Sequence, residues 1–249
     1  MSKDWTKTRA KVKDFIESEI YPKETELAKG TPEAREMLGS LMQLAKDEKI
    51  WALGHPEDIG GGGMPFMEYV YVNEVIGRSS FAMVALGTHS LQDSIMLREF
   101  ASPHWRDQYL EPLVQGEIFP SFGMTEPDVA SSDPTQLQTT AILDNGTWKI
   151  NGTKWFTTGA ARAAYTTVMC RTELDAPSHG AFSMIIVPTD NPGYKIVRET
   201  PVLGINGGHY EVKYDNVEVP EENLLGPRGQ GFIIAQKRCL LYTSDAADE

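Results

Sequence analysis

Residues 137–150 read LQTTAILDNGTWKI and encode two short strands joined by a tight turn. Residues 137–143 are rich in Thr and aliphatic side chains, which favour an extended backbone. Asp144, Asn145 and Gly146 then supply the residue types that adopt the positive φ angles of a two-residue hairpin turn. Residues 147–150 return as the second strand. The stretch therefore predicts a β-hairpin.

The strand pattern continues beyond this hairpin. Asn151-Gly152 is a second hairpin-turn signal, and it leads into residues 154–157. Four further strand candidates follow, at residues 166–170, 181–187, 195–198 and 210–219. Short strands with a turn every 8–12 residues or so are typical of β-barrels and sandwiches. We therefore expect an antiparallel barrel or sandwich.

The part of the chain before residue 119 has a helical period instead. Apolar residues recur every three or four positions between residues 5 and 28, where Pro22 should interrupt the helix, and Thr31-Pro32 is a helix start signal. We expect further helices at residues 65–77, with Val70 among its buried side chains, and at 81–100 and 102–116. The fold class is thus α+β, with a helical bundle followed by the β-domain.

Composition excludes several classes of function. The chain has 249 residues, 35 acidic against 23 basic, and a formal net charge of −12, so it would repel a nucleic acid. Its two cysteines cannot form a disulfide framework or a zinc site. No apolar run approaches the roughly 20 residues of a membrane span, and no signal peptide is evident. We expect a cytoplasmic protein, or one of an organelle matrix in a eukaryote.

Two polar clusters are candidate binding segments. Residues 122–133 carry hydroxyl groups at Thr125 and Ser131 where the helical and strand patterns meet; the alternative is a plain interdomain loop. Residues 154–159 combine the aromatic pair Trp155 and Phe156 with hydroxyl groups, which suits a flat heterocycle; the alternative is a core strand.

Other residues attract attention but have simpler interpretations. Glu126 has the chemistry of a base, yet we prefer a role in the loop scaffold. His89 lies in an apolar segment and is interpreted as a core residue, and His209 as a turn residue. Residues 60–63 are four glycines without the Lys-[ST] of a phosphate loop, so we expect a flexible loop near a substrate entrance.

Taken together, these clusters resemble the flavin-dependent acyl-CoA dehydrogenases. The second cluster is compared with that family's strand pattern N-G-x-K-x-[WF]-[IV]-[TS]. Four stretches match the family in order and spacing: 106–117 (RDQYLEPLVQGE), 125–131 (TEPDVAS), 151–157 (NGTKWFT) and 215–232 (DNVEVPEENLLGPRGQGF). The resemblance covers residues 5–238, and the loop is closest to a T-E-P-D-V-A-S-S-D branch of the family.

The resemblance implies roles for particular residues. FAD would be the cofactor. Thr125 would bind its pyrimidine edge, beside the main chain of Phe122 and Met124, and Trp155 with Phe156 would pack on the isoalloxazine. Thr157 would face the flavin N5 region, and Ser131 would touch the pantetheine–phosphate part of an acyl-CoA substrate. No metal site is implied.

The resemblance also implies a larger enzyme of fatty acid β-oxidation. We expect domains at 1–118 (helical), 119–230 (β) and 231–249, the last being the start of a truncated four-helix domain. The catalytic base would lie in that third domain, so we expect this chain to be inactive. We expect residues 239–249 to be foreign, either a read-through from a wrong frame or an assembly error. An electron-transfer flavoprotein would accept the electrons, and the full-length form would be a homo-oligomer.

Two alternatives remain open at this point. One is a sister chemistry on the same fold, an acyl-CoA oxidase or a nitroalkane oxidase. The other belongs to a different class, a non-catalytic module that binds flavin or CoA.

Overall fold

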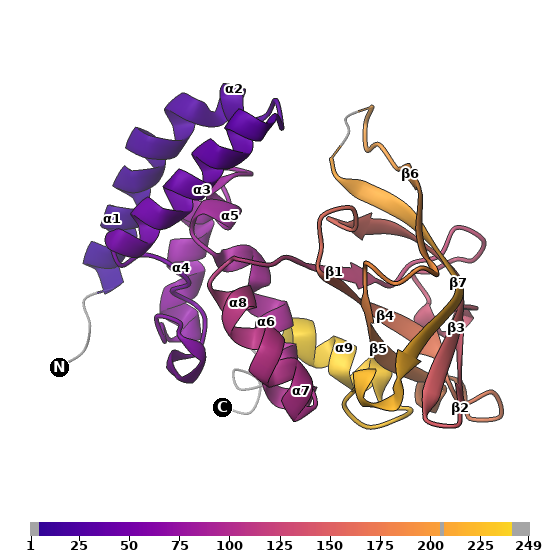
Figure 1. Cartoon of the computed structure of the whole chain (residues 1–249). Helices are drawn as coiled ribbons and strands as arrows, with labels where there is room; N and C mark the ends of the chain where they lie inside the picture. Colours follow the sequence, from indigo (N-terminus) through magenta and orange to yellow (C-terminus); the bar gives the residue numbers. More distant parts are fainter. Residues whose placement is uncertain (1–4, 205–206, 241–249) are drawn as a thin grey trace. The chain divides into compact units, whose positions relative to one another are not determined.

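A computed structural model describes residues 5–204 and 207–240, the last three by their backbone alone (Figure 1). The described residues form two compact units. One, the helical unit, comprises the residues up to Ser94 together with Val114–Gly116. The other, the sheet unit, comprises Ile95–Leu113 and the residues from Glu117 onward. Each unit is described by itself below.

The first helical segment runs as expected to Leu27, but it changes its winding near Pro22. α1 (Trp5–Phe15) leads into a π-helical turn η1 (Ile16–Ile20), a 3₁₀ turn η2 (Tyr21–Lys23) that contains Pro22, and α2 (Glu24–Leu27). The proline has no N–H for the helical ladder, so the interruption was predictable. Thr31 caps α3 (Pro32–Asp47) by accepting a hydrogen bond of 3.3 Å from the Ala34 N–H.

The helices that follow depart from prediction in two places. α4 (Phe66–Ile76) agrees with the expected helix, although Val70 is 41% exposed and not buried. The expected helix over residues 81–100 is wrong, because it breaks into α5 (Ala82–Ala85), η4 (Thr88–Ser90) and α6 (Leu91–Phe100). The break falls at Gly87, whose φ is +71° and whose Cα lies so close to the Trp51 ring that a Cβ would clash.

The four glycines at residues 60–63 form a tight turn over the residues just before them. A short 3₁₀ helix, η3 (Glu57–Ile59), precedes this turn. The N–H groups of Gly61, Gly62 and Gly63 donate to the carbonyl groups of Pro56, Ala52 and His55 at 2.9–3.0 Å. The backbone here is held by hydrogen bonds, so the glycines serve close packing.

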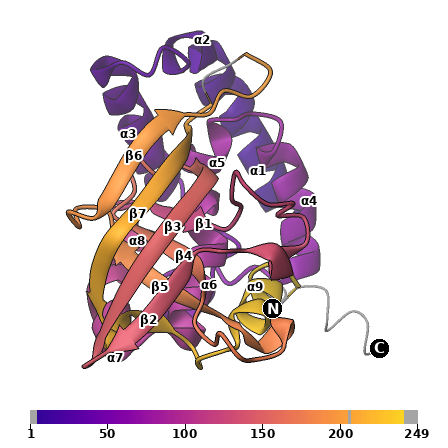
Figure 2. The same cartoon turned by 90° about the vertical axis from the view of Figure 1, so that its right-hand side faces the viewer.

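The sheet unit contains eight strands in its described residues, and they form one sheet (Figure 2). The order is β6-β7-β3-β2-β4-β5-β8, with β1 paired to β4. The strands are β1 (Pro120–Gly123), β2 (Thr140–Asp144), β3 (Thr147–Thr158), β4 (Tyr165–Arg171), β5 (Phe182–Pro188), β6 (Tyr194–Glu199), β7 (His209–Pro220) and β8 (Leu224–Leu225). Short 3₁₀ turns lie between them: η6 (Pro134–Gln136), η7 (Ser178–Gly180) and η8 (Glu221–Asn223).

The expected antiparallel β-domain and its opening hairpin are confirmed, with one qualification. Asn145 and Gly146 have φ angles of +49° and +77° at the β2–β3 turn. β1 and β2, however, each pair with β4 in parallel. β1, β2 and β4 therefore run in one direction, and β3 runs against them.

The second turn expected at Asn151-Gly152 is wrong. β3 runs straight through these residues, and the register of β3 against β7 shifts between Ile150 and Gly152. The Asn151 side chain accepts a hydrogen bond of 2.9 Å from the Asn216 N–H. A Cβ at Gly152 would lie 2.3 Å from the Thr139 hydroxyl oxygen. The Asn-Gly pair therefore marks a β-bulge.

Two cores hold the sheet unit together. The first lies between the β3–β7 and β4–β5 parts of the curled sheet and includes the fully buried Trp148. The second lies on the helices α7 (Pro103–Trp105) and α9 (Gly231–Leu240) and includes Trp105 and Phe182. A π-helical turn η5 (Arg106–Leu110) and α8 (Glu111–Val114) continue from α7, as the expected helix over residues 102–116 requires.

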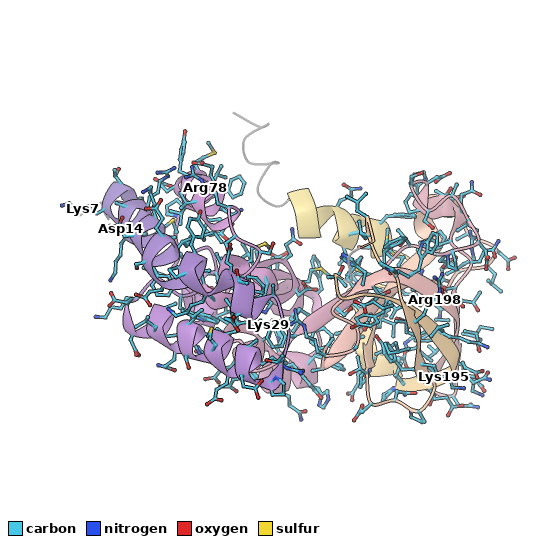
Figure 3. The ribbon with its side chains drawn as sticks, turned by 90° about the horizontal axis from the view of Figure 1, so that it is seen from above. Lys7, Asp14, Lys29, Arg78, Lys195 and Arg198 are labelled. Carbon is cyan, nitrogen blue, oxygen red and sulfur yellow. The ribbon has the colours of Figure 1, made fainter. Side chains whose placement is uncertain are left out.

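The hairpin of β6 and β7 carries exposed ion pairs. Lys195 Nζ lies 2.6 Å from an Asp215 carboxylate oxygen, and Arg198 Nε lies 2.7 Å from one of Glu211. Figure 3 shows Lys195 and Arg198 at the surface of this hairpin. Among the described residues, no helix is both long enough and apolar enough to cross a membrane.

The expected helix from residue 232 is present as α9, which reaches Leu240. The hypothesis of a foreign segment at residues 239–249 concerns side chains that lie outside the described residues.

Candidate functional site

The first polar cluster begins where β1 ends. Phe122 and Met124 are partly buried and pack against the second core. Thr125 pairs with Trp155 of β3 through two hydrogen bonds. The Trp155 N–H donates to the Thr125 carbonyl at 2.9 Å, and the Thr125 hydroxyl donates to the Trp155 carbonyl at 2.9 Å. The structure thus brings the two predicted clusters together.

A buried ion pair lies beneath this contact. Lys154 is 0% exposed and Glu126 is 4% exposed, and Lys154 Nζ donates to Glu126 Oε1 at 2.8 Å. The ammonium also donates to the Met124 carbonyl at 2.9 Å. The carboxylate accepts from the N–H groups of Gln138 at 2.7 Å and Thr139 at 2.9 Å. Both Glu126 oxygens are engaged, which fits a role in the scaffold.

The charges of the pair depend on each other. Burial raises the pKa of Glu126, but the charge of Lys154 and the hydrogen bonds outweigh burial, so this pKa lies below its usual value. Burial lowers the pKa of the Lys154 ammonium, and the charge of Glu126 opposes that effect. Nearby, burial raises the pKa of Cys170 to about 12, which makes its thiol unreactive at neutral pH.

Ser131 closes the loop that follows Glu126. Its hydroxyl oxygen accepts from the Glu126 N–H at 2.8 Å, and the hydroxyl donates to the Glu126 carbonyl at 3.1 Å. Further along, the Asp133 carboxylate accepts from the Thr135 N–H at 3.0 Å and caps η6. The loop is therefore folded on itself, and Ser131 remains half-buried at its turn.

The end of β3 alternates between buried and exposed side chains. Phe156 has a φ of +49° at a bulge in the β3–β7 register, and the residue is 43% exposed. Its ring makes a T-shaped contact with the Trp155 ring, with 4.9 Å between the ring centroids. Thr157 is 0% exposed, and its hydroxyl has no hydrogen-bond partner in the described part of the chain. Thr158 is exposed, and its hydroxyl oxygen lies 2.8 Å from His209 Nδ1.

Of the two hydroxyl residues at the end of this strand, Thr158 is therefore the exposed one. Counting the pattern N-G-x-K-x-[WF]-[IV]-[TS] from Asn151 puts its aromatic position at Phe156 and its hydroxyl at Thr158. Both lie one residue later than the roles expected for Trp155 and Thr157. The sequence analysis missed Thr158, and this count was the signal that could have found it.

The donors and rings of this segment suit the ring system of a flavin. Thr125 and Thr158 provide hydroxyl groups, and Phe156 provides an accessible aromatic face. None of the hydrogen bonds described above uses the Thr125 N–H, which can donate to a carbonyl oxygen of a ligand. Hydroxyl and main-chain donors beside an aromatic wall can bind a flat heterocycle and stabilise negative charge on it. The residues present fit the isoalloxazine part of FAD.

The other candidate residues lie elsewhere or have structural partners. His89 belongs to η4 in the helical unit. In the same unit, His55 is a buried polar residue that the sequence analysis did not single out. Its Nε2 lies 3.2 Å from the Ser90 hydroxyl oxygen. His209 contributes to the candidate site through Thr158.

Family models match most of the chain. The model of the acyl-CoA dehydrogenase N-terminal domain matches residues 2–117. The model of the acyl-CoA dehydrogenase middle domain matches residues 121–217. The chain belongs to the acyl-CoA dehydrogenase family.

Individual relatives agree with this assignment. A Mycobacterium tuberculosis protein named "Probable acyl-CoA dehydrogenase FadE2" is 39% identical over 244 residues, which cover 92% of this chain and 59% of the relative. A structure from Mycobacterium abscessus, assigned to the acyl-CoA dehydrogenases, has a TM-score of 0.88 at 32% identity over 96% of this chain and 64% of that one. The chain thus spans less than two thirds of their length.

A third solved structure has the same fold. The glutaryl-CoA dehydrogenase of Mycobacterium smegmatis, solved in complex with FADH2, has a TM-score of 0.76 at 22% identity. The match covers 97% of this chain and 60% of that one.

Proposed function

We propose that the protein to which this chain belongs is an FAD-dependent acyl-CoA dehydrogenase, which converts an acyl-CoA thioester to the 2-enoyl-CoA. The observation that carries the proposal is the junction of the 122–131 loop with the end of β3. It places Thr125, Phe156 and Thr158 on adjoining segments of one domain. FAD, when bound, supplies the hydride acceptor.

Each residue of the junction has a part in this proposal. The Thr125 N–H, with the main chain of Phe122 and Met124, donates to the pyrimidine edge of the flavin, and the Thr125 hydroxyl oxygen, whose hydrogen goes to the Trp155 carbonyl, can accept there. Phe156, supported by Trp155, covers the ring system and excludes water. These donors favour the reduced cofactor, because it carries more negative charge than the oxidised form.

Two further positions concern the reacting end of the flavin and the substrate. Thr158, rather than the buried Thr157, presents its hydroxyl to the flavin N5 region. Ser131 retains one free lone pair on its hydroxyl oxygen and lies at the loop's turn, where the pantetheine of CoA would pass. Glu126 is not assigned as the catalytic base, because both of its carboxylate oxygens are already engaged.

The wider setting is part of the same proposal. We propose an acyl-CoA as the substrate, an electron-transfer flavoprotein as the acceptor, a homo-oligomeric full-length form and a place in β-oxidation. We also propose that residues 1–249 alone reduce no dye with acyl-CoA. Measurable acyl-CoA-dependent dye reduction by the purified chain would overturn this last point.

The adjacent threonines offer a matched test of the site. Thr158→Val removes an exposed hydroxyl, and we expect FAD to bind about fivefold to tenfold more weakly, as for one lost hydrogen bond. Thr157→Val removes a buried hydroxyl of the same size, and FAD binding should stay at the wild-type value. Quenching of flavin fluorescence on titration measures both constants. Equal losses in the two variants, or none in either, would contradict the proposed site.

A further inference from the structure

Lys154 is fully buried although its side chain carries a charge. Lysine is almost never fully buried unless it is paired, and here the pairing crosses from β3 to the loop after β1. The ammonium meets Glu126 Oε1 at 2.8 Å and the Met124 carbonyl oxygen at 2.9 Å. One buried cation therefore holds two successive parts of the loop.

The bond to Met124 acts on the neighbouring residue. The Met124 carbonyl and the Thr125 N–H belong to the same planar peptide group, whose electrons are delocalised over oxygen, carbon and nitrogen. A positive charge at the oxygen draws electron density from the nitrogen, so the N–H becomes a stronger donor, as in other polarised chains of hydrogen bonds. In a buried setting this effect is screened little by water.

The residue that carries this N–H is held on its other side. The carbonyl and the hydroxyl of Thr125 each make a hydrogen bond with the main chain of Trp155, the residue that follows Lys154. The Lys154 ammonium therefore holds the Met124 carbonyl while the Trp155 backbone holds Thr125, and the Thr125 N–H between these contacts has a defined direction.

We infer that Lys154 is a positioning residue of the flavin site: its ammonium, balanced by Glu126, fixes and polarises the Met124–Thr125 peptide so that the Thr125 N–H binds the flavin pyrimidine edge strongly. This inference rests on the proposed function. It goes beyond it by assigning a residue that does not touch the cofactor. Because the stronger donor favours the more negative, reduced flavin, Lys154 raises the midpoint potential of bound FAD.

Removing both charges separates positioning from folding. Lys154→Met alone leaves Glu126 as an unpaired buried carboxylate, and the variant risks unfolding. The double variant Lys154→Met with Glu126→Gln leaves no unpaired charge, and replacement of buried pairs by neutral residues is often tolerated. Exposed Lys195→Met is the matched control for loss of one lysine.

We expect the double variant to fold but to bind FAD about tenfold more weakly, as for one lost charge-assisted hydrogen bond. Its bound flavin should have a more negative midpoint potential than wild type. In the absence of FAD, the Trp155 amide, which donates to Thr125, should exchange its hydrogen faster in the double variant than in wild type. Lys195→Met should match wild type in all three measurements.

Two results would overturn the inference in distinguishable ways. A folded double variant that binds FAD with wild-type affinity and potential would reduce the ion pair to a structural element, while the proposed function would stand. A wild-type chain that binds no FAD would instead contradict the proposed flavin site of this chain. In that case, wild-type exchange at Trp155 in the double variant would show separately that Lys154 does not fix the peptide.

Discussion

Two regions of the chain bury titratable side chains, one in the charged form and the other in the neutral form. In the sheet unit, Lys154 and Glu126 are buried as an ion pair with further hydrogen bonds to Met124, Gln138 and Thr139. In the helical unit, His55 is 0% exposed and faces the Ser90 hydroxyl. Burial, reinforced by the neighbouring His89, lowers the pKa of His55 to about 4, so its imidazole is neutral at pH 7.

The difference shows two ways to meet the cost of removing a charge from water. In the first region both side chains stay charged, and the ion pair together with hydrogen bonds to the main chain offsets their loss of hydration. The second gives up the charge. Of these two buried sites, it is the Lys154–Glu126 pair that adjoins the proposed cofactor site.

The largest effect should come from breaking the ion pair on one side. Lys154→Met leaves the Glu126 carboxylate uncompensated, and we expect a loss of about 3–5 kcal/mol in the free energy of unfolding of the sheet unit. Denaturant titration followed by hydrogen exchange of β3 and β7 peptides measures this loss. A loss under about 1 kcal/mol, the usual value for an exposed pair, would show that water reaches the site.

Acid should act on the helical unit through His55. Its unfolded form takes up a proton near pH 6.5, while the folded form resists until about pH 4. Stability is therefore lost as the pH falls from 6.5 to about 4 and then levels off. Over about 2.5 pH units the loss is roughly 3 kcal/mol.

Unfolding free energies at pH 7, 5.5 and 4 check this value. His55→Gln, which cannot be protonated, should flatten the profile of the helical unit over the same range. An unchanged slope in that variant would assign the acid loss to other groups.

Glu126 should act at lower pH than His55. Its folded pKa is depressed, so its stabilising contribution is present above the usual carboxyl pKa near 4.5 and is lost as the pH falls further. Glu126→Gln should therefore make the sheet unit less sensitive to pH below 4.5. Unfolding free energies of wild type and variant at pH 5, 4 and 3 test this. The same dependence on pH in both proteins would count against an ionised Glu126.

The loop that carries Glu126 should be weakened moderately by Ser131→Ala. The variant removes the acceptor of the Glu126 N–H, and we expect a loss of about 1–2 kcal/mol. Ser132→Ala, next to it and exposed, is the control and should change stability little. Equal effects of the two substitutions would contradict the closing role of Ser131.

The smallest effect is expected at the exposed pairs. Lys195→Met breaks the contact with Asp215, and both side chains are more than a third exposed. Water and salt screen such a pair, so the change in unfolding free energy should stay below about 1 kcal/mol. Denaturant titration at low and high salt tests this, and a larger loss would remove the contrast with Lys154.

The sequence predicted the elements whose signals are local. The hairpin at Asn145-Gly146 and the cap at Thr31 depend on neighbouring residues, and both are present. Asn151-Gly152 carries the same local signal as the hairpin turn, yet it forms a bulge. Its conformation is decided by Asn216, which pairs with it from β7, and no local pattern contains that information.

The candidate site was predictable in part for the same reason. The family motifs located the loop and the strand, and the structure joins them through Thr125 and Trp155. Which hydroxyl is accessible depended on a bulge at Phe156, and the burial of Lys154 depended on Glu126, which lies 28 positions earlier. Neither composition nor the local pattern of a strand reveals that a lysine in it has a partner so far away in the sequence.

The central claim is that a flavin binds where the 122–125 loop meets the end of β3. Hydrogen exchange of the chain with and without FAD tests it most directly, because it locates binding without requiring turnover. We predict FAD-dependent protection of peptides that contain residues 122–126 and 155–159, with β6 and its ion pairs unchanged. Absence of protection, or protection confined to other segments, would contradict the claim.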